Sequence, residues 1–166
     1  MDVADVILSA ACAPASGGRN KLTPRFVRHF ALLSLPTPST ETLITIFRAI
    51  LGGFLGDFAR VVQTLGDPIV FAAVSVYNRM KQELLPTPAK SHYLFNLRDL
   101  SKCVQGILQA DTSNYATTAQ MLRLFYHESM RVYHDRLINE EDKKHFKELM
   151  EEICMKYFNS PVSKFF

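Results

Sequence analysis

The sequence predicts a mainly α-helical fold, in which a helical bundle follows two short strands that end a truncated α/β domain. Three observations favour this fold class. From residue 40 onward, apolar residues recur with a period of about 3.6, and capping residues and prolines stand where helices should begin. Residues 5–12 and 29–34 are nearly continuous apolar runs, which is typical of strands buried on both faces. The apolar share of 48% over 166 residues is enough for the core of one domain.

The two strands are expected within the first part of the chain. Residues 5–12 form the first strand, and a polar loop follows it. Thr23 and Pro24 then match an N-cap and a first-turn proline, which open a short helical turn before the second strand at residues 29–34. Because two buried strands cannot form a stable sheet alone, we expect the chain to be a segment of a larger protein.

The remainder of the chain is predicted to form helices around one apolar core. Asp67 and Pro68 begin one long helix, and Asn96 caps another. Acidic and basic residues alternate on the outer face of the last helix, which is typical of a solvated surface. The predicted helices cover residues 43–55, 58–64, 67–84, 96–109, 118–137 and 140–158, and a frayed tail follows.

Charge and cysteine content exclude several classes of protein. A net charge of +3 is too weak to indicate a nucleic-acid partner by itself. The three cysteines include no C-x-x-C pair, so they support neither a disulfide framework nor a zinc ribbon. No apolar run reaches the roughly 20 residues of a membrane span, and the first residues lack the basic start of a signal peptide. We therefore expect an intracellular protein without nucleic-acid or membrane partners.

The motifs of a self-sufficient nucleotide site are missing from the sequence. The glycine cluster at residues 52–56 lacks the lysine of a G-x-x-x-x-G-K-[ST] loop and lies at a helix end. His127 and Glu128 begin like the zinc motif H-E-x-x-H, but Arg131 stands in place of the second histidine, so no metal site is expected. We therefore expect this chain alone to be unable to hydrolyse ATP.

Two arginines and a lysine are candidate phosphate ligands. Arg28 precedes the second predicted strand, where a rigid edge can present its planar guanidinium to a phosphate across an interface. Arg98 lies in the first turn of a helix, whose N-terminus already attracts anions, and Lys102 lies one turn later on roughly the same face. The alternative is that both arginines form structural salt bridges, Arg98 with Asp99 or another acid.

Several stretches together resemble one known family. They are residues 12–14, 17–20, 23–30, 86–93, 96–102 and 125–137, and they resemble the third AAA+ module of dynein heavy chains, axonemal chains more closely than cytoplasmic ones. The resemblance covers nearly the whole chain. It implies that residues 1–38 are the C-terminal remnant of the AAA+ large subdomain, that residues 39–160 are the helical small (lid) subdomain, and that residues 161–166 are a tail.

The resemblance also implies a function. The chain would belong to an ATP-driven ciliary motor, and its parent module would hold ATP or ADP with Mg through motifs upstream of this chain, with none bound to the chain alone. Arg98, supported by Lys102, would be the sensor-two arginine that reaches the module's own nucleotide. Arg28 would be the arginine finger that reaches the neighbouring module. The family's sensor-one asparagine would fall near Ala13, a departure that argues against efficient hydrolysis at this module.

The partners implied by the resemblance are the neighbouring AAA+ modules of the same chain, and, through the full-length protein, the microtubule and other dynein chains. The implied location is the cytoplasm, the cytoskeleton and the axoneme of the cilium. The lid would couple nucleotide state between neighbouring modules of the motor ring.

Two alternatives remain open on the sequence alone. The first is a non-catalytic helical protein-interaction module, which a complete hydrophobic core in the isolated chain would favour. A large exposed apolar strand edge would instead favour the motor segment. The second is the lid of a DNA-handling AAA+ protein, against which the mild charge and the lack of a basic, aromatic stripe argue.

Overall fold

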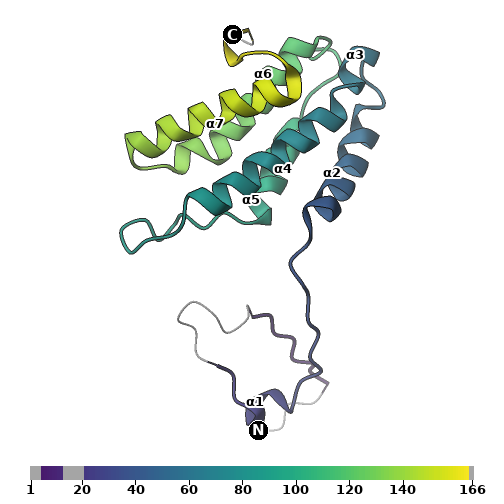
Figure 1. Cartoon of the computed structure of the whole chain (residues 1–166). Coiled ribbons are helices and arrows are strands. Elements are labelled where there is room, and N and C mark those ends of the chain that lie inside the picture. The colour runs from purple at the N-terminus through teal and green to yellow at the C-terminus, as the bar shows by residue number, and fades with distance from the viewer. Residues whose placement is uncertain (1–4, 13–20, 165–166) are drawn as a thin grey trace. The chain divides into compact units, whose positions relative to one another are not determined.

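The computed structural model describes residues 5–12 and 21–164, and within them the chain is mainly helical (Figure 1). It divides into two compact units, Met1–Thr37 and Pro38–Phe166. The elements are α1 (Pro24–Val27), α2 (Thr40–Leu55), α3 (Arg60–Gln63), α4 (Gly66–Glu83), α5 (Leu97–Ile107), α6 (Thr118–Val132), η1 (His134–Arg136), α7 (Glu140–Phe158) and η2 (Val162–Lys164).

The first unit confirms the predicted helical turn but not the predicted strands. Pro24 stands at the first position of α1, as the sequence indicates. The prediction of strands at residues 5–12 and 29–34 is wrong for the described chain, because neither range forms a strand. A strand needs neighbours for its backbone hydrogen bonds, and neither run has one here. Their apolar side chains are therefore exposed, 95% for Ile7 and 91% for Leu33.

The second unit is a helical bundle with its own core. The central helix α4 packs against α2, α7 and α5, and α5 also packs against α6 (Figure 1). The largest fully buried side chains come from most of these helices and from the loop before α5, and they include Tyr93, Tyr133, Phe125, Phe146, Leu51, Ile69, Met80 and Leu100. This core confirms the amphipathic patterns read from the sequence.

The helix boundaries agree with the predictions to within a few residues, except at the end of α6. The first long helix begins at Thr40, because the Ser39 hydroxyl accepts a hydrogen bond from the backbone N–H of Thr42 and so acts as the N-cap. The helix predicted for residues 118–137 ends at Val132, and the short η1 turn then leads to α7. This break matters for the site, because it turns Arg136 back toward the start of α5.

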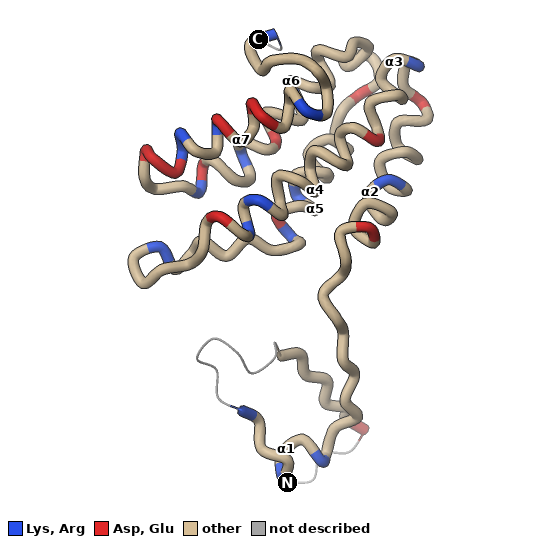
Figure 2. The backbone as a smooth tube through the Cα atoms, viewed as in Figure 1, with Lys and Arg blue, Asp and Glu red and all other residues tan. Residues whose placement is uncertain are grey.

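Charge is distributed unevenly over the helices. Along α7 acidic and basic residues alternate, which matches the solvated face predicted for it, whereas α2 carries only Glu41 and Arg48 (Figure 2). Within the described part of the chain, no helix has both the length and the apolar character needed to span a membrane.

Candidate functional site

The candidate site begins with the cap of α5. Asn96 has an extended backbone, and its side-chain Oδ1 accepts a hydrogen bond of 2.8 Å from the backbone N–H of Arg98. In return, the backbone N–H of Asn96 donates to Oδ2 of Asp99 over 2.9 Å. This reciprocal capping box fixes the first turn of the helix, in which Arg98 lies. The predicted cap is therefore confirmed, and Asp99 completes it.

Asp99 does not pair with Arg98. It is 5% exposed, and its Oδ1 accepts a hydrogen bond of 2.8 Å from Arg136, which neutralises it. The structural alternative that Arg98 pairs with this neighbour is therefore wrong. Arg98 and Lys102 are both exposed, and among the described residues neither side chain forms an ion pair. Because four residues separate them on one helix, the two cations lie on one face.

Arg136 ties the loop before α5 to the corner between α6 and α7. One of its terminal nitrogens donates to the backbone carbonyls of His92 and Leu94, over 3.0 Å and 3.3 Å. Its guanidinium also lies 5.0 Å from the centre of the Phe95 ring. The planar fork of arginine suits this task, since it can serve a carboxylate and two carbonyls at the same time.

A second set of bonds joins the same loop to the start of α7. The Tyr93 hydroxyl donates to Asp142 over 2.8 Å and accepts from the backbone N–H of Ile138 over 3.0 Å. Lys90 forms an ion pair of 2.5 Å with the same carboxylate. Burial raises the pKa of Asp142, but the hydrogen bonds from Lys90 and Tyr93 outweigh it and hold that pKa below its ordinary value. The loop is thus fixed at both Tyr93 and Arg136.

Arg28 lies in the first unit, apart from this network. It follows α1 directly, it is exposed, and its Nε donates to Nε2 of His29 over 3.2 Å. Arg98 belongs to the second unit. Ala13, the expected place of the sensor-one residue, lies outside the described residues.

The incomplete zinc motif at His127 and Glu128 contains an ion pair instead of a metal-ligand set. Glu128 is 7% exposed, and its carboxylate accepts two hydrogen bonds from Arg131, of 2.6 Å and 3.1 Å. The residue that replaces the second histidine thus neutralises the buried acid. Within the described ranges, no group of three or more histidine, cysteine, aspartate or glutamate side chains gathers in a way that could hold a metal ion.

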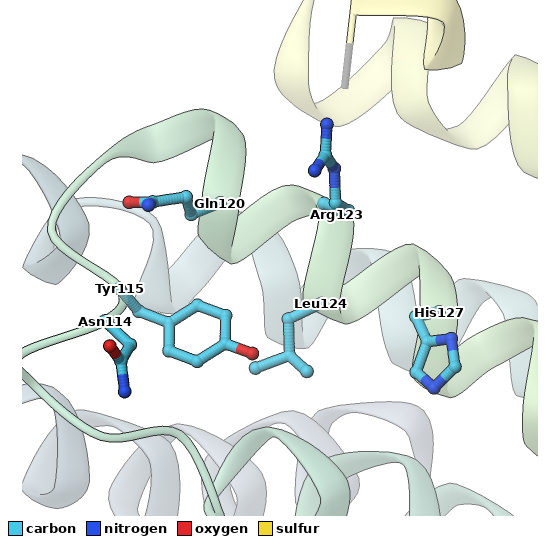
Figure 3. Close-up of a pocket in the computed structure, with 6 residues that line it drawn as sticks. All are labelled: Asn114, Tyr115, Gln120, Arg123, Leu124 and His127. Carbon is cyan, nitrogen blue, oxygen red and sulfur yellow. The ribbon is translucent and has the colours of Figure 1, made fainter. Parts of the chain in front are cut away.

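Sequence reasoning missed a pocket of about 380 Å³ on the side of α6. Figure 3 shows the Tyr115 ring reaching toward Leu124. The pocket is lined by Asn114, Tyr115, Gln120, Arg123, Leu124 and His127, none of which is an acid or fully buried. Neither Arg98 nor Lys102 is among these residues. No sequence signal could have found it, since a polar loop and the exposed side of a helix form its walls.

Comparison with known proteins adds two family matches. The model of the AAA+ lid domain matches residues 69–163, and the model of the P-loop containing dynein motor region matches residues 1–38. The first match covers more than half of the chain.

The chain is also similar to much longer proteins. It is 56% identical over 161 residues to human Dynein axonemal heavy chain 6, a match that covers 97% of this chain and 4% of that protein. It is 44% identical to rat Dynein axonemal heavy chain 12, over 90% of this chain and 5% of that protein. It is 42% identical to human Dynein axonemal heavy chain 1, over 98% of this chain and 4% of that protein. The chain thus spans only a small part of these relatives.

Proposed function

Because this chain belongs to the AAA+ lid domain family and matches axonemal dynein heavy chains over nearly its whole length, we propose that it couples nucleotide state between neighbouring modules of a motor ring. We assign it to the third AAA+ module, with residues 1–38 as the remnant of the large subdomain, residues 39–160 as the lid and residues 161–166 as a tail. The names of the relatives indicate the axoneme of the cilium, within the cytoskeleton and the cytoplasm, as the location.

The observation that carries this proposal is that Arg98 is exposed and forms no ion pair with any residue that the structure describes. An arginine in the first turn of a helix faces the positive end of the helix dipole, which is slightly unfavourable without a compensating anion. The adjacent acid cannot supply that anion, because Asp99 is buried and paired with Arg136. An external phosphate can, and Lys102 adds a second cation one turn later. We assign Arg98 the sensor-two role and Lys102 a supporting one.

The exposed cations of α5 fit a nucleotide phosphate that other parts of the parent module hold. ATP with Mg, when bound there, would supply the phosphoryl group of the reaction, and ADP would remain as its product. Arg98 would bind and orient a phosphate oxygen, and Lys102 would strengthen the local positive potential. The family match of residues 1–38 to a P-loop motor region supports such a module.

Arg28 is proposed as the arginine finger toward the neighbouring module. Its guanidinium is exposed directly after α1, where its only described side-chain contact is with the adjacent His29. A free planar fork at the edge of a subdomain can stabilise the charge that develops during phosphoryl transfer. The microtubule, other dynein chains and the neighbouring AAA+ modules are the proposed partners of the full-length protein.

The lid can transmit motion because it is one packed body. Its helices share a continuous core, so a pull on α5 moves α4, α6 and α7 with it. Packed interfaces of this kind move as units rather than bending gradually. A change of phosphate contact at Arg98 would therefore be passed to every surface of the lid.

The proposal is tested by Arg98→Ala and Arg28→Ala in the full heavy chain. We expect Arg98→Ala to weaken nucleotide binding at its own module and to slow the ATPase and microtubule gliding. Arg28→Ala should leave that affinity unchanged and lower the rate at the neighbouring module, by less than the roughly 10³–10⁵ known for such arginines in fast sites. Arg60→Ala, which removes another exposed arginine, is the control. Unchanged affinity, ATPase rate and gliding in both test variants would refute the proposal.

A non-catalytic interaction module remains the second candidate, and one observation favours it. The described residues of the second unit share one hydrophobic core, as an interaction module would require. The exposed apolar runs of the first unit argue the other way, toward a segment of a larger α/β domain. The relatives described above are dynein heavy chains, which argues against the DNA-handling lid.

A further inference from the structure

We propose that Arg136 is the positioning residue for Arg98: it holds the first turn of α5 in place and keeps Arg98 free for an external phosphate. This inference rests on the role proposed for Arg98. It assigns a task to a residue that lies 38 positions further along the chain and does not itself need to touch the nucleotide.

The first step of the argument is the span of the Arg136 contacts. One terminal nitrogen bonds the carbonyls of His92 and Leu94, which precede the cap of α5, and the other bonds Oδ1 of Asp99, which lies inside its first turn. One rigid guanidinium thus grips the chain on both sides of Asn96. Since the plane of the fork fixes the angle between these bonds, it also fixes the direction in which the helix starts.

The second step concerns the two oxygens of Asp99. Oδ2 accepts the backbone N–H of Asn96 and so belongs to the capping box, whereas Oδ1 belongs to Arg136. Loss of Arg136 would leave a buried carboxylate with one unpaired oxygen, next in sequence to Arg98. Arg136 therefore satisfies the acid that would otherwise compete with a phosphate for Arg98.

The third step is that both terminal nitrogens of Arg136 are already engaged. Its side chain is 32% exposed, but these nitrogens are bound to the carboxylate and two carbonyls, and the flat face of the guanidinium lies over Phe95. A phosphate that bound the terminal nitrogens would compete with these bonds. Arg98 is the side chain that would bind the phosphate, and Arg136 acts by positioning Arg98.

The test compares four variants of the full heavy chain: Arg136→Lys, Arg136→Ala, Arg98→Ala and the double variant Arg98→Ala/Arg136→Ala. The first readout is the affinity for a fluorescent ATP analogue. A hydrogen bond to a charged group is worth about 1.5–3 kcal/mol, so Arg98→Ala should weaken binding by roughly tenfold to a hundredfold. Arg136→Ala should cause a comparable loss, and Arg136→Lys a smaller one, because lysine keeps the charge but not the fork.

The double variant separates positioning from independent action. If Arg136 works through Arg98, the double variant binds no more weakly than the weaker single variant. If the two losses multiply, Arg136 acts independently and the inference is overturned while the role of Arg98 stands. If Arg98→Ala leaves affinity unchanged, the role proposed for Arg98 fails, and this inference fails with it.

A second readout needs no nucleotide. Hydrogen exchange at the backbone N–H groups of Asn96 and Arg98 should become faster in Arg136→Lys, because the capping box is no longer clamped. Arg79→Lys is the matched control: it alters another arginine that binds two acids, Glu83 and Glu152 on α4 and α7. Unchanged exchange at the cap in Arg136→Lys, or an equal increase in the control, would overturn the inference.

Discussion

The close approach of α5 and α6 at Gly106 can be tested by adding a single methyl group. A Cβ atom placed on Gly106 would lie 1.9 Å from Oε2, 2.2 Å from Cδ and 2.6 Å from Cγ of Glu128. These distances are far below van der Waals contact, so Gly106→Ala forces the Glu128 side chain out of its buried place. The carboxylate then also loses its bonds to Arg131.

The expected change in the free energy of unfolding follows from three terms, of which one stabilises and two destabilise the chain. Alanine is favoured over glycine inside a helix by roughly 0.5–1 kcal/mol. Overpacking costs about 1–3 kcal/mol, and the lost ion pair adds at most about 1 kcal/mol because Arg131 is largely exposed. Together these terms give a destabilisation between about 0 and 3.5 kcal/mol, and we expect a value near the middle of this range, about 1–2 kcal/mol.

A double-mutant cycle isolates this clash. In a Glu128→Ala background the obstructing side chain is absent, so Gly106→Ala should stabilise by up to about 1 kcal/mol, and the coupling energy should reach about 2–3 kcal/mol. Guanidinium unfolding followed by circular dichroism measures all four proteins. Gly52→Ala is the control, since a Cβ there meets nothing within 4 Å and should only stabilise. If Gly106→Ala stabilises equally in both backgrounds, the reasoning is refuted.

Three further predictions rest on buried or partly buried groups. Tyr133→Phe should leave stability unchanged or raise it, because no described residue forms a hydrogen bond with its buried hydroxyl. Tyr93→Phe should instead lower the free energy of unfolding by about 1–3 kcal/mol, because its hydroxyl bonds both Asp142 and the backbone of Ile138. Denaturant unfolding curves of the two variants measure this difference. Burial raises the pKa of Cys103 and of Cys154 to about 12. Neither thiol should therefore react with iodoacetamide at pH 8 until the chain is unfolded, and mass spectrometry detects the labelling. Rapid labelling of either cysteine in the folded chain would contradict this. Asp142→Asn should destabilise the chain at neutral pH by about 1–2 kcal/mol. Because the pKa of Asp142 in the folded chain lies below its ordinary value, this difference should shrink only as the pH falls below about 4. A pH-independent difference would contradict the assignment.

The helices were predictable because their signals are local. The apolar stripe of α2, the aspartate and proline at the start of α4 and the Asn96 cap of α5 each lie within a few residues of the structure they specify. The apolar run at residues 5–12 carried an equally clear signal for burial. This signal does not indicate whether a neighbouring strand is present, and a strand forms only where such a neighbour supplies hydrogen bonds.

The candidate site was predictable only in part. The sequence placed Arg98 in the first turn of a capped helix, which the structure confirms. That it is unpaired depends on Arg136, whose bond to Asp99 spans 37 positions and leaves no local pattern. Gly106 did leave a local pattern in the sequence, because a lone glycine inside an amphipathic helix indicates the close approach of a neighbouring side chain or backbone. Only the structure identifies that neighbour as Glu128.

The exposed apolar side chains of the first unit would have to be buried in the proposed ring. Ile7, Leu8, Leu32, Leu33 and Leu35 are each at least 72% exposed. Burial of one such side chain is worth about 1.5–3 kcal/mol, so together they represent an amount comparable to the whole stability of a typical domain, roughly 5–15 kcal/mol. Under the proposed function, the missing strands of the large subdomain supply that burial. The lid packs around its own core, whereas the segment that carries Arg28 would be ordered only by the parent sheet. Arg28 would therefore act as an arginine finger only in an assembled module.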